Sequence, residues 1–281
     1  MKKFSLLVFF IMLMRFTLHA QGSSSEFNDR FSLRLGGGFG IGLCYDDPCD
    51  YYDEDYYPSY DNYKSINFVP GRGFDVNIGA SYMFTKHIGV DLGLKDFFGL
   101  PIKQTINNFQ GEEASFHSES YRYSGMMLQV VPSVVLDLGL DKIDPYARFG
   151  MSIGVFPQVM LKKTEVHNVD TYEYVGKYMG NVPLGFSAAV GVKYNLNDHF
   201  SLFGEFDCNG INYSPKKYKL TKYSVNGVDE LSTLTLRQTE IDFVKSFDAS
   251  QSLSNDSPSK QLRQTFPFSN FEINIGASYK F

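Results

Sequence analysis

Histidine and serine are the side chains of this sequence that could support hydrolysis or lipid modification. The histidines are His19, His87, His117, His167 and His199. Ser118 and Ser120 lie close to His117 in the chain, and a histidine base beside a serine is the pair that activates a hydroxyl for attack. No HExxH or CxxC motif occurs. We therefore expect no enzyme and no cofactor, and His117 and His199 are the residues to test for a lipid-modifying activity.

The segment 44–70 combines two cysteines with many tyrosines and acids. The acids are Asp46, Asp47, Asp50, Asp53, Glu54, Asp55 and Asp61. Such a cluster could bind Ca²⁺, but the EF-hand spacing is missing, so we interpret it as a solvated, repulsive loop. Export would allow a disulfide between Cys44 and Cys49, which would close only a short loop; two free thiols are the alternative. Because tyrosine forms contact surfaces, 44–70 and 214–266 are candidate partner-binding loops.

Charged side chains recur within segments that otherwise alternate apolar and small residues. They are Arg34, Asp75, Asp91, Lys95, Arg148, Lys193, Glu205, Asp207 and Glu272. With Asp137 and Lys280 added, five bases face six acids if all share one interior. Charges in a narrow interior are costly unless they are paired. We expect a lumen plugged by salt bridges, and a small diffusion pore is the alternative.

These charges are positioned by segments with period-two patterning. The segments are 30–43, 74–84, 88–95, 124–138, 147–155, 184–194, 199–213 and 271–281. Alternation puts the two sets of side chains on opposite faces of a strand. One face is apolar throughout, and the other carries glycine, serine and charge, which suits a narrow barrel interior. The pattern predicts eight strands, or ten if a loop segment enters the wall.

The connections between these segments alternate in length. Residues 85–86, 139–143 and 195–198 are short, whereas 44–70, 99–123, 158–180 and 214–266 are long. A barrel inserted from the periplasm has short turns on one side and long loops on the other. We therefore predict an all-β, transmembrane, antiparallel up-and-down barrel with long extracellular loops and short periplasmic turns.

Parts of the long loops carry local structure signals. Asn226-Gly227 predicts a type I′ turn between 218–225 and 228–236, and Gln110-Gly111 indicates a turn in the second loop. Residues 237–259 have no clear period, and we expect them to be mobile.

The last strand, residues 271–281, resembles the closing strand of small bacterial outer-membrane barrels, the OmpA transmembrane domain and OmpX-like proteins. Residues 145–148 (Pro-Tyr-Ala-Arg) also resemble these families, and the likeness covers roughly 29–281. The resemblance implies that the barrel assembly machinery reads the terminal strand through Tyr279 and Phe281. The loop 214–266 is longer than a minimal member needs.

Composition and the first residues bear on location. The net charge of −5 offers no basic field for nucleic acid, and a mean hydropathy of −0.21 is too polar for a bundle of membrane helices. Lys2 and Lys3 precede an apolar run at 6–13, which predicts a signal peptide over 1–20 with cleavage before Gln21; an uncleaved anchor is the alternative. A short segment, 21–29, and the barrel, 30–281, follow.

Three functions remain open at this point. The first is a structural or interaction protein of the cell outer membrane, in contact with outer-membrane lipid and with a surface partner. The second is a porin-like diffusion channel. The third is a lipid-modifying enzyme.

Overall fold

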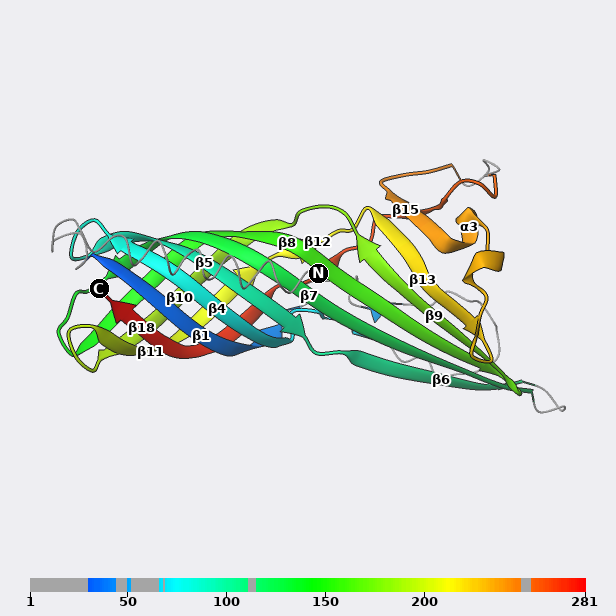
Figure 1. The fold of residues 1–281 in the computed structure, drawn as a ribbon, viewed down its shortest axis with the longest axis horizontal. Coiled ribbons are helices and arrows are strands. Elements are labelled where there is room, and N and C mark those ends of the chain that lie inside the picture. The colour runs from blue at the N-terminus through cyan, green and yellow to red at the C-terminus, as the bar shows by residue number, and fades with distance from the viewer. Residues whose placement is uncertain (1–29, 44–49, 52–65, 68, 111–114, 249–253) are drawn as a thin grey trace.

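The computed structural model describes residues 30–43, 50–51, 66–67, 69–110, 115–248 and 254–281. Eight strands form a closed antiparallel barrel, as predicted (Figure 1). In spatial order they are β1 (Phe31–Gly42), β4 (Gly73–Met83), β5 (Ile88–Gly99), β7 (Ser115–Asp137), β8 (Ile143–His167), β10 (Leu184–Asn195), β11 (Phe200–Gly210) and β18 (Asn270–Lys280). Spatial order follows chain order, and the pairing of β1 with β18, with Gly36 opposite Gly276, closes the wall.

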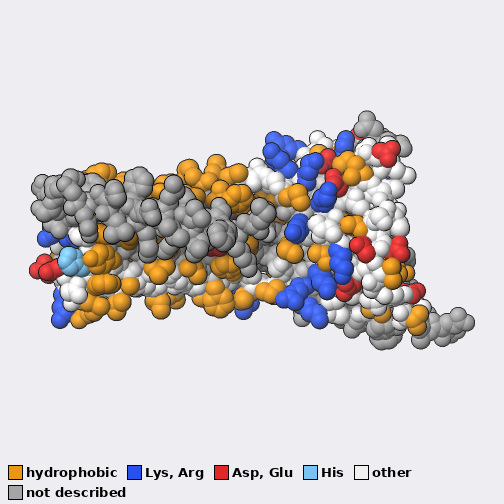
Figure 2. Space-filling view, viewed as in Figure 1, with side chains coloured by type: hydrophobic (Ala, Val, Ile, Leu, Met, Phe, Trp, Pro, Cys, Tyr) orange, Lys and Arg blue, Asp and Glu red, His pale blue; other side chains and the backbone are white. Residues whose placement is uncertain are grey.

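The wall is apolar outside and polar inside. On β4, Phe74 is 54% exposed, whereas the next residue, Asp75, is 3% exposed. The same alternation runs along the other wall strands, and Figure 2 shows hydrophobic side chains over the visible barrel surface. A soluble protein would bury the apolar set instead. The inversion fits a wall that is surrounded by lipid and encloses a polar interior.

Aromatic rings gather where the wall strands meet the short turns, which we name the short-turn end. Phe31 and Phe281 lie 5.5 Å apart between ring centroids, and Phe200 and Tyr279 lie 5.0 Å apart. The amide of Phe281 also donates to the carbonyl of Phe31 at 3.2 Å. The two ends of the described chain are therefore fastened to each other at this end.

At the opposite end, which we name the long-loop end, β7 and β8 continue past the barrel as part of a flared sheet (Figure 1). Their register shifts between Met126 and Leu128, and Phe156 adopts a φ of 54°. The sheet is completed by β6 (Ile102–Gln110), β9 (Asp170–Met179), β13 (Lys217–Val225), β14 (Val228–Asp229), β15 (Glu240–Val244) and β16 (Ser259–Leu262). The predicted turn in the second loop is outlined by the β6–β7 hairpin, although 111–114 lie outside the described residues.

One face of the flared sheet packs over the barrel mouth. The cluster there includes Phe97, Met127, Tyr178, Ile211 and Phe268, and we name it the apolar cap. The short pair β12 (Asn212–Tyr213) and β17 (Phe266–Pro267) contributes to it. A second short pair, β2 (Asp50–Tyr51) and β3 (Ile66–Asn67), belongs to the first long loop.

The structure corrects two predictions in the last long loop. The Asn226-Gly227 turn forms, with positive φ at both residues, but its second arm is a strand only at Val228–Asp229. A 3-10 turn (Leu231–Thr233) and a helical turn, α3 (Leu236–Thr239), follow. Residues 240–244, which we expected to be mobile, form β15 instead, because Ile241 and Phe243 pack toward the apolar cap. No helix in the described part of the chain is long and apolar enough to cross a membrane.

Candidate functional site

The first group of lumen charges links four wall strands through buried ion pairs. Asp91 accepts hydrogen bonds from Arg34 at 2.8 Å and from Arg148 at 3.1 Å. Arg148 also donates to Glu205 at 2.5 Å. Ser81 adds a bond of 2.7 Å to Asp91. Arg34 is partly exposed and Arg148 is buried, and each guanidinium has a buried carboxylate partner, which is what makes charge tolerable in the lumen.

The second group lies closer to the long-loop end and centres on Lys95. Its ammonium contacts Asp207 at 3.0 Å and also Glu272, and all three side chains are buried. Asn274 donates to Asp207 at 3.0 Å. Asp75 has one oxygen bonded to Asn77 at 2.8 Å and a second oxygen without a hydrogen-bond partner.

The third group lies near the short turns. Lys193 contacts Asp137 and lies 5.0 Å from the centroid of the Tyr146 ring. Asp144 is buried beside them and accepts from the amide of Leu140 at 2.9 Å. Sequence reasoning missed Asp144, because it stands just before the segment in which alternation was recognised.

Glycine on β1 makes room for these side chains. Gly38 pairs with Asn274 and with Asp75, and a Cβ added at Gly38 would overlap the Asn274 side chain. Neighbouring strands therefore fill the part of the lumen that β1 leaves empty.

The balance of lumen charge differs from the sequence estimate. Lys280, assigned there to the lumen face, is exposed at the short-turn end, and Asp144 joins the acids. The bases in the lumen are Arg34, Lys95, Arg148 and Lys193, and the acids are Asp75, Asp91, Asp137, Asp144, Glu205, Asp207 and Glu272. Among the described residues, four bases thus face seven acids. The excess of acids in the lumen is therefore larger than the excess of one that the sequence predicted.

The apolar cap lies above the Lys95 group. Phe97 follows Lys95 on the inward face of β5, and Ile211 follows the inward residues Asp207 and Asn209 of β11. Phe97, Met127 and Phe268 are 0% exposed. The lumen is therefore crossed by a layer of ion pairs and then by a layer of packed apolar side chains.

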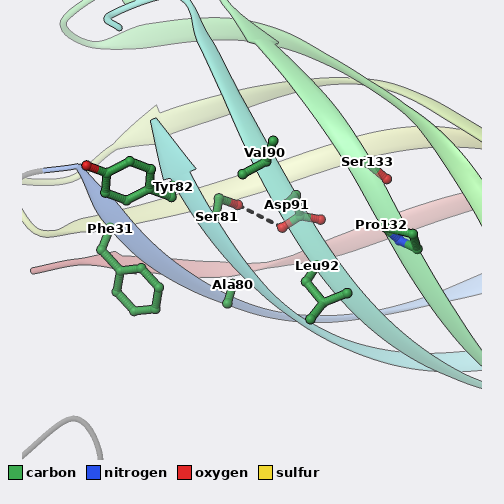
Figure 3. A pocket seen from close by; sticks show the side chains of 9 residues that line it. All are labelled: Phe31, Ala80, Ser81, Tyr82, Val90, Asp91, Leu92, Pro132 and Ser133. Atoms are coloured by element: carbon green, nitrogen blue, oxygen red, sulfur yellow. Dashed lines mark hydrogen bonds between the residues drawn. The ribbon is translucent and has the colours of Figure 1, made fainter. Parts of the chain in front are cut away.

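A shallow hollow of about 310 Å³ opens near the short-turn end (Figure 3). Phe31, Ala80 and Leu92 point to one side of the wall there, whereas Ser81 and Asp91 bond to each other on the lumen side. The hollow exists because Ala80 is small and lies between larger outward side chains. Its lining on the outer face is apolar apart from the Tyr82 side chain, so it offers mainly packing.

One motif that sequence reasoning overlooked is Gly150-Met151-Ser152-Ile153-Gly154, which matches the GxSxG pattern of serine hydrolases. In those enzymes the serine stands on a sharp turn between a strand and a helix. Here Ser152 lies in the middle of β8, is 0% exposed, and donates to Gln129 at 2.8 Å. The match therefore has no nucleophile elbow.

Two of the histidines, His87 and His199, contact backbone carbonyls of neighbouring segments. His87 contacts the Asp137 carbonyl at 3.1 Å, and His199 contacts the Lys280 carbonyl at 2.9 Å. His117 and His167 are opposite each other on β7 and β8. Among the residues with described positions, no group of three or more His, Cys, Asp or Glu is arranged to hold a metal ion.

The remaining site residues divide between described and undescribed regions. Tyr279 and Phe281 belong to the aromatic group at the short-turn end, with ring centroids 5.0 Å apart. Cys44 and Cys49 lie outside the described residues. Cys208 is a free thiol and pairs across strands with Phe271 on the outer face.

Comparisons with known proteins identify the family. A family model described as "Outer membrane protein beta-barrel domain" matches residues 9–228. No curated protein matches this chain. Two solved structures align with it: Ail, the attachment invasion locus protein of Yersinia pestis, and the same protein in complex with the heparin analogue sucrose octasulfate. Their sequence identities are 11% and 9%, their TM-scores are 0.30 and 0.33, and each alignment covers 90% of this chain and 97% of Ail.

The family match spans most of the chain and agrees with the closed eight-stranded wall, its apolar exterior and its polar lumen. The chain therefore belongs to the outer membrane protein beta-barrel domain family, and its location is the outer membrane.

Proposed function

We propose that this protein is a closed barrel whose flared sheet is a platform for interactions at the cell surface. One observation carries the proposal: β7 and β8 continue well past the barrel, over a mouth filled by the apolar cap (Figure 1). The long-loop end faces the exterior in this proposal, as it does in barrels inserted from the periplasm.

The filled lumen favours this role over a diffusion channel. A permeating ion would have to separate Lys95 from Asp207 and then pass the apolar cap. Removing one partner from a buried ion pair costs about 3–5 kcal/mol, which is a high barrier for rapid transport.

The flared sheet also offers a suitable surface for a polypeptide partner. Within the described part of the chain, β6 pairs with β7 alone, so its other edge presents unpaired backbone groups. Such an edge can accept an extended segment as an additional strand. We therefore infer a partner that binds in extended conformation, on host, matrix or a neighbouring cell.

Conductance of the purified protein in planar bilayers tests the closed barrel. The expected record is flat across an applied voltage. Discrete conductance steps would overturn the closed-lumen proposal and establish the channel.

Adhesion tests the platform. Along an edge strand, successive N–H groups point alternately toward the neighbouring strand and toward the open edge. Gln104 and Thr105 are neighbours on β6, so their N–H groups point in opposite directions. Proline has no N–H group, so one of the variants Gln104→Pro and Thr105→Pro removes a donor from the open edge, and the other removes a donor to β7. Both variants should reduce adhesion of protein-bearing cells to host cells or matrix, while the barrel still folds. Unchanged adhesion in both would refute binding through β6.

A further inference from the structure

A row of cations crosses the flared sheet at one height. Cross-strand pairing places Lys103 opposite Arg122, and Arg122 opposite Lys162. The row continues through Val175 to Lys222. Adjacent strands lie about 4.8 Å apart, so four of five neighbouring positions hold a positive charge within a narrow strip.

The row lies on the face of the sheet opposite the apolar cap. Arg122 is exposed, whereas its chain neighbours Tyr121 and Tyr123 are buried on the cap side. The exposed face carries further cations in the adjacent rows. We define the basic face as Lys103, Arg122, Lys162, Lys177, Lys217, Lys219 and Lys222.

Acids on the same face balance only part of this charge. Glu173 contacts Lys222 at 2.8 Å and Lys162 at 3.4 Å, Glu240 contacts Lys219, and Asp242 contacts Lys217. The bond from Lys222 and the charge of Lys162 lower the pKa of Glu173, so this acid is ionised at neutral pH. Asp229 pairs with Ser224 in the same cross-strand row as Glu173 and is a further acid on this face. Seven cations against these four acids still leave three positive charges, although the whole chain carries −5.

Lys103, Arg122 and Lys177 have no acidic partner among the residues that the structure describes. Like charges placed directly opposite each other on neighbouring strands destabilise a sheet. The row is therefore unfavourable by itself and becomes favourable when anions lie over it.

The position of the basic face indicates which anions these are. It continues the outward face of the barrel wall. On β7, Arg122 and Met126 are four residues apart and share a face, and on β8, Lys162 and Met160 are two residues apart and share a face. Figure 2 shows lysine and arginine gathered where the hydrophobic barrel surface gives way to the flared end. Lys177 pairs with Met160 itself, and Lys162 lies about 7 Å beyond Met160 along β8, so the basic face begins where the apolar wall ends, at the depth of lipid headgroups.

We propose that the basic face binds phosphate groups of lipid headgroups in the membrane leaflet at the long-loop end. The ligands are the phosphates of a phosphorylated glycolipid or phospholipid, which lie in one plane and can bridge neighbouring cations of the row. The bound headgroups fix the depth and rotation of the flared sheet relative to the membrane. This inference depends on the barrel alone and needs no protein partner.

Native mass spectrometry of the detergent-solubilised protein tests the proposal through titration with bisphosphorylated lipid A and with its dephosphorylated form. The wild type should bind the bisphosphorylated form more tightly. The triple variant Lys103→Gln, Arg122→Gln, Lys162→Gln should lose about fivefold in affinity per cation, hence about a hundredfold. The control Lys86→Gln, Lys142→Gln, Lys280→Gln neutralises three exposed lysines at the short-turn end and should bind as the wild type does.

Three results would overturn the proposal. The first is equal affinity for both lipids in the wild type. The second is an equal loss in the control variant, which would indicate an unspecific effect of net charge. The third is competition by inositol hexakisphosphate at concentrations equal to those of the lipid, which would identify a soluble polyanion as the ligand.

Discussion

The hydroxyl of Tyr146 donates a hydrogen bond of 2.7 Å to Glu205 across Gly191, the residue that pairs with both. Gly191 permits the bond because it has no side chain. A Cβ added there would lie 2.8 Å from the Tyr146 ring and 2.8 Å from the Glu205 Cβ.

Gly191→Ala should therefore destabilise the barrel by about 1–3 kcal/mol, because the added methyl displaces one partner of a buried bond. Urea unfolding in detergent micelles measures the change. Gly204→Ala is the matched control, since a Cβ at Gly204 meets no atom within 4 Å. Equal stability of the two variants would contradict the account of Gly191.

Arg148→Met should cost about 3–5 kcal/mol of unfolding free energy, because it leaves Asp91 and Glu205 buried without this partner. Lys222→Met breaks the exposed pair with Glu173 and should cost less than about 1 kcal/mol. The same unfolding assay compares them. A small loss for Arg148→Met would mean that water replaces its guanidinium in the lumen.

Deletion of Phe281 should lower the yield of folded barrel in the membrane, because its amide and ring fasten β18 to Phe31. Folded protein is measured as the band that shifts between unheated and boiled samples. Phe247→Ala removes an exposed ring at the long-loop end and serves as the control. Full assembly without Phe281 would remove its proposed role as a signal.

The Cys44–Cys49 disulfide remains a prediction, and maleimide labelling of the denatured, unreduced protein tests it. The chain has three cysteines, so a disulfide leaves only Cys208 to react. We expect one adduct by intact mass before reduction and three after it. Three adducts before reduction would show free thiols.

We expect His117→Ala and His199→Ala to leave the lipid A of the cell unchanged. His199 contacts the Lys280 carbonyl and lies over Tyr279, with ring centroids 5.9 Å apart, so its described contacts are structural. Mass spectrometry of extracted lipid A gives the comparison. An altered lipid profile in either variant would support the enzyme instead.

Alternation predicted the wall because each wall strand must satisfy two solvents at once. A residue such as Asp75 between Phe74 and Val76 has one acceptable orientation when lipid lies outside and other charges lie inside. Alternation also predicted that Glu272 and Lys95 point into the lumen. Which lumen charges pair with each other depends on the stagger of the strands around the barrel, which alternation does not give. The contact of Lys95 with Asp207 therefore could not be read from the sequence.

The flared sheet was harder to predict because its pattern is shorter and more polar. Tyr121 and Tyr123 extend the alternation of β7 toward the N-terminus of the predicted segment 124–138, so the sequence does contain a sign that this strand is longer. Residues 240–244 also alternate, with Ile241 and Phe243 on one face, but five residues among polar neighbours do not stand out from a loop. Their burial depends on contacts with Tyr178 and Tyr218, which come from distant parts of the chain.

The seam between β1 and β18 has a consequence for the order of events during biogenesis. β1 cannot form its pairing with β18 until the rest of the wall is present, because Gly36 on the first wall strand pairs with Gly276 on the last. A chain that lacks the last strand forms an open sheet with two edge strands, and each edge presents unpaired backbone N–H and C=O groups. Closure of the wall therefore requires both terminal strands, and until it occurs the unpaired edge of β1 is open to wrong pairing.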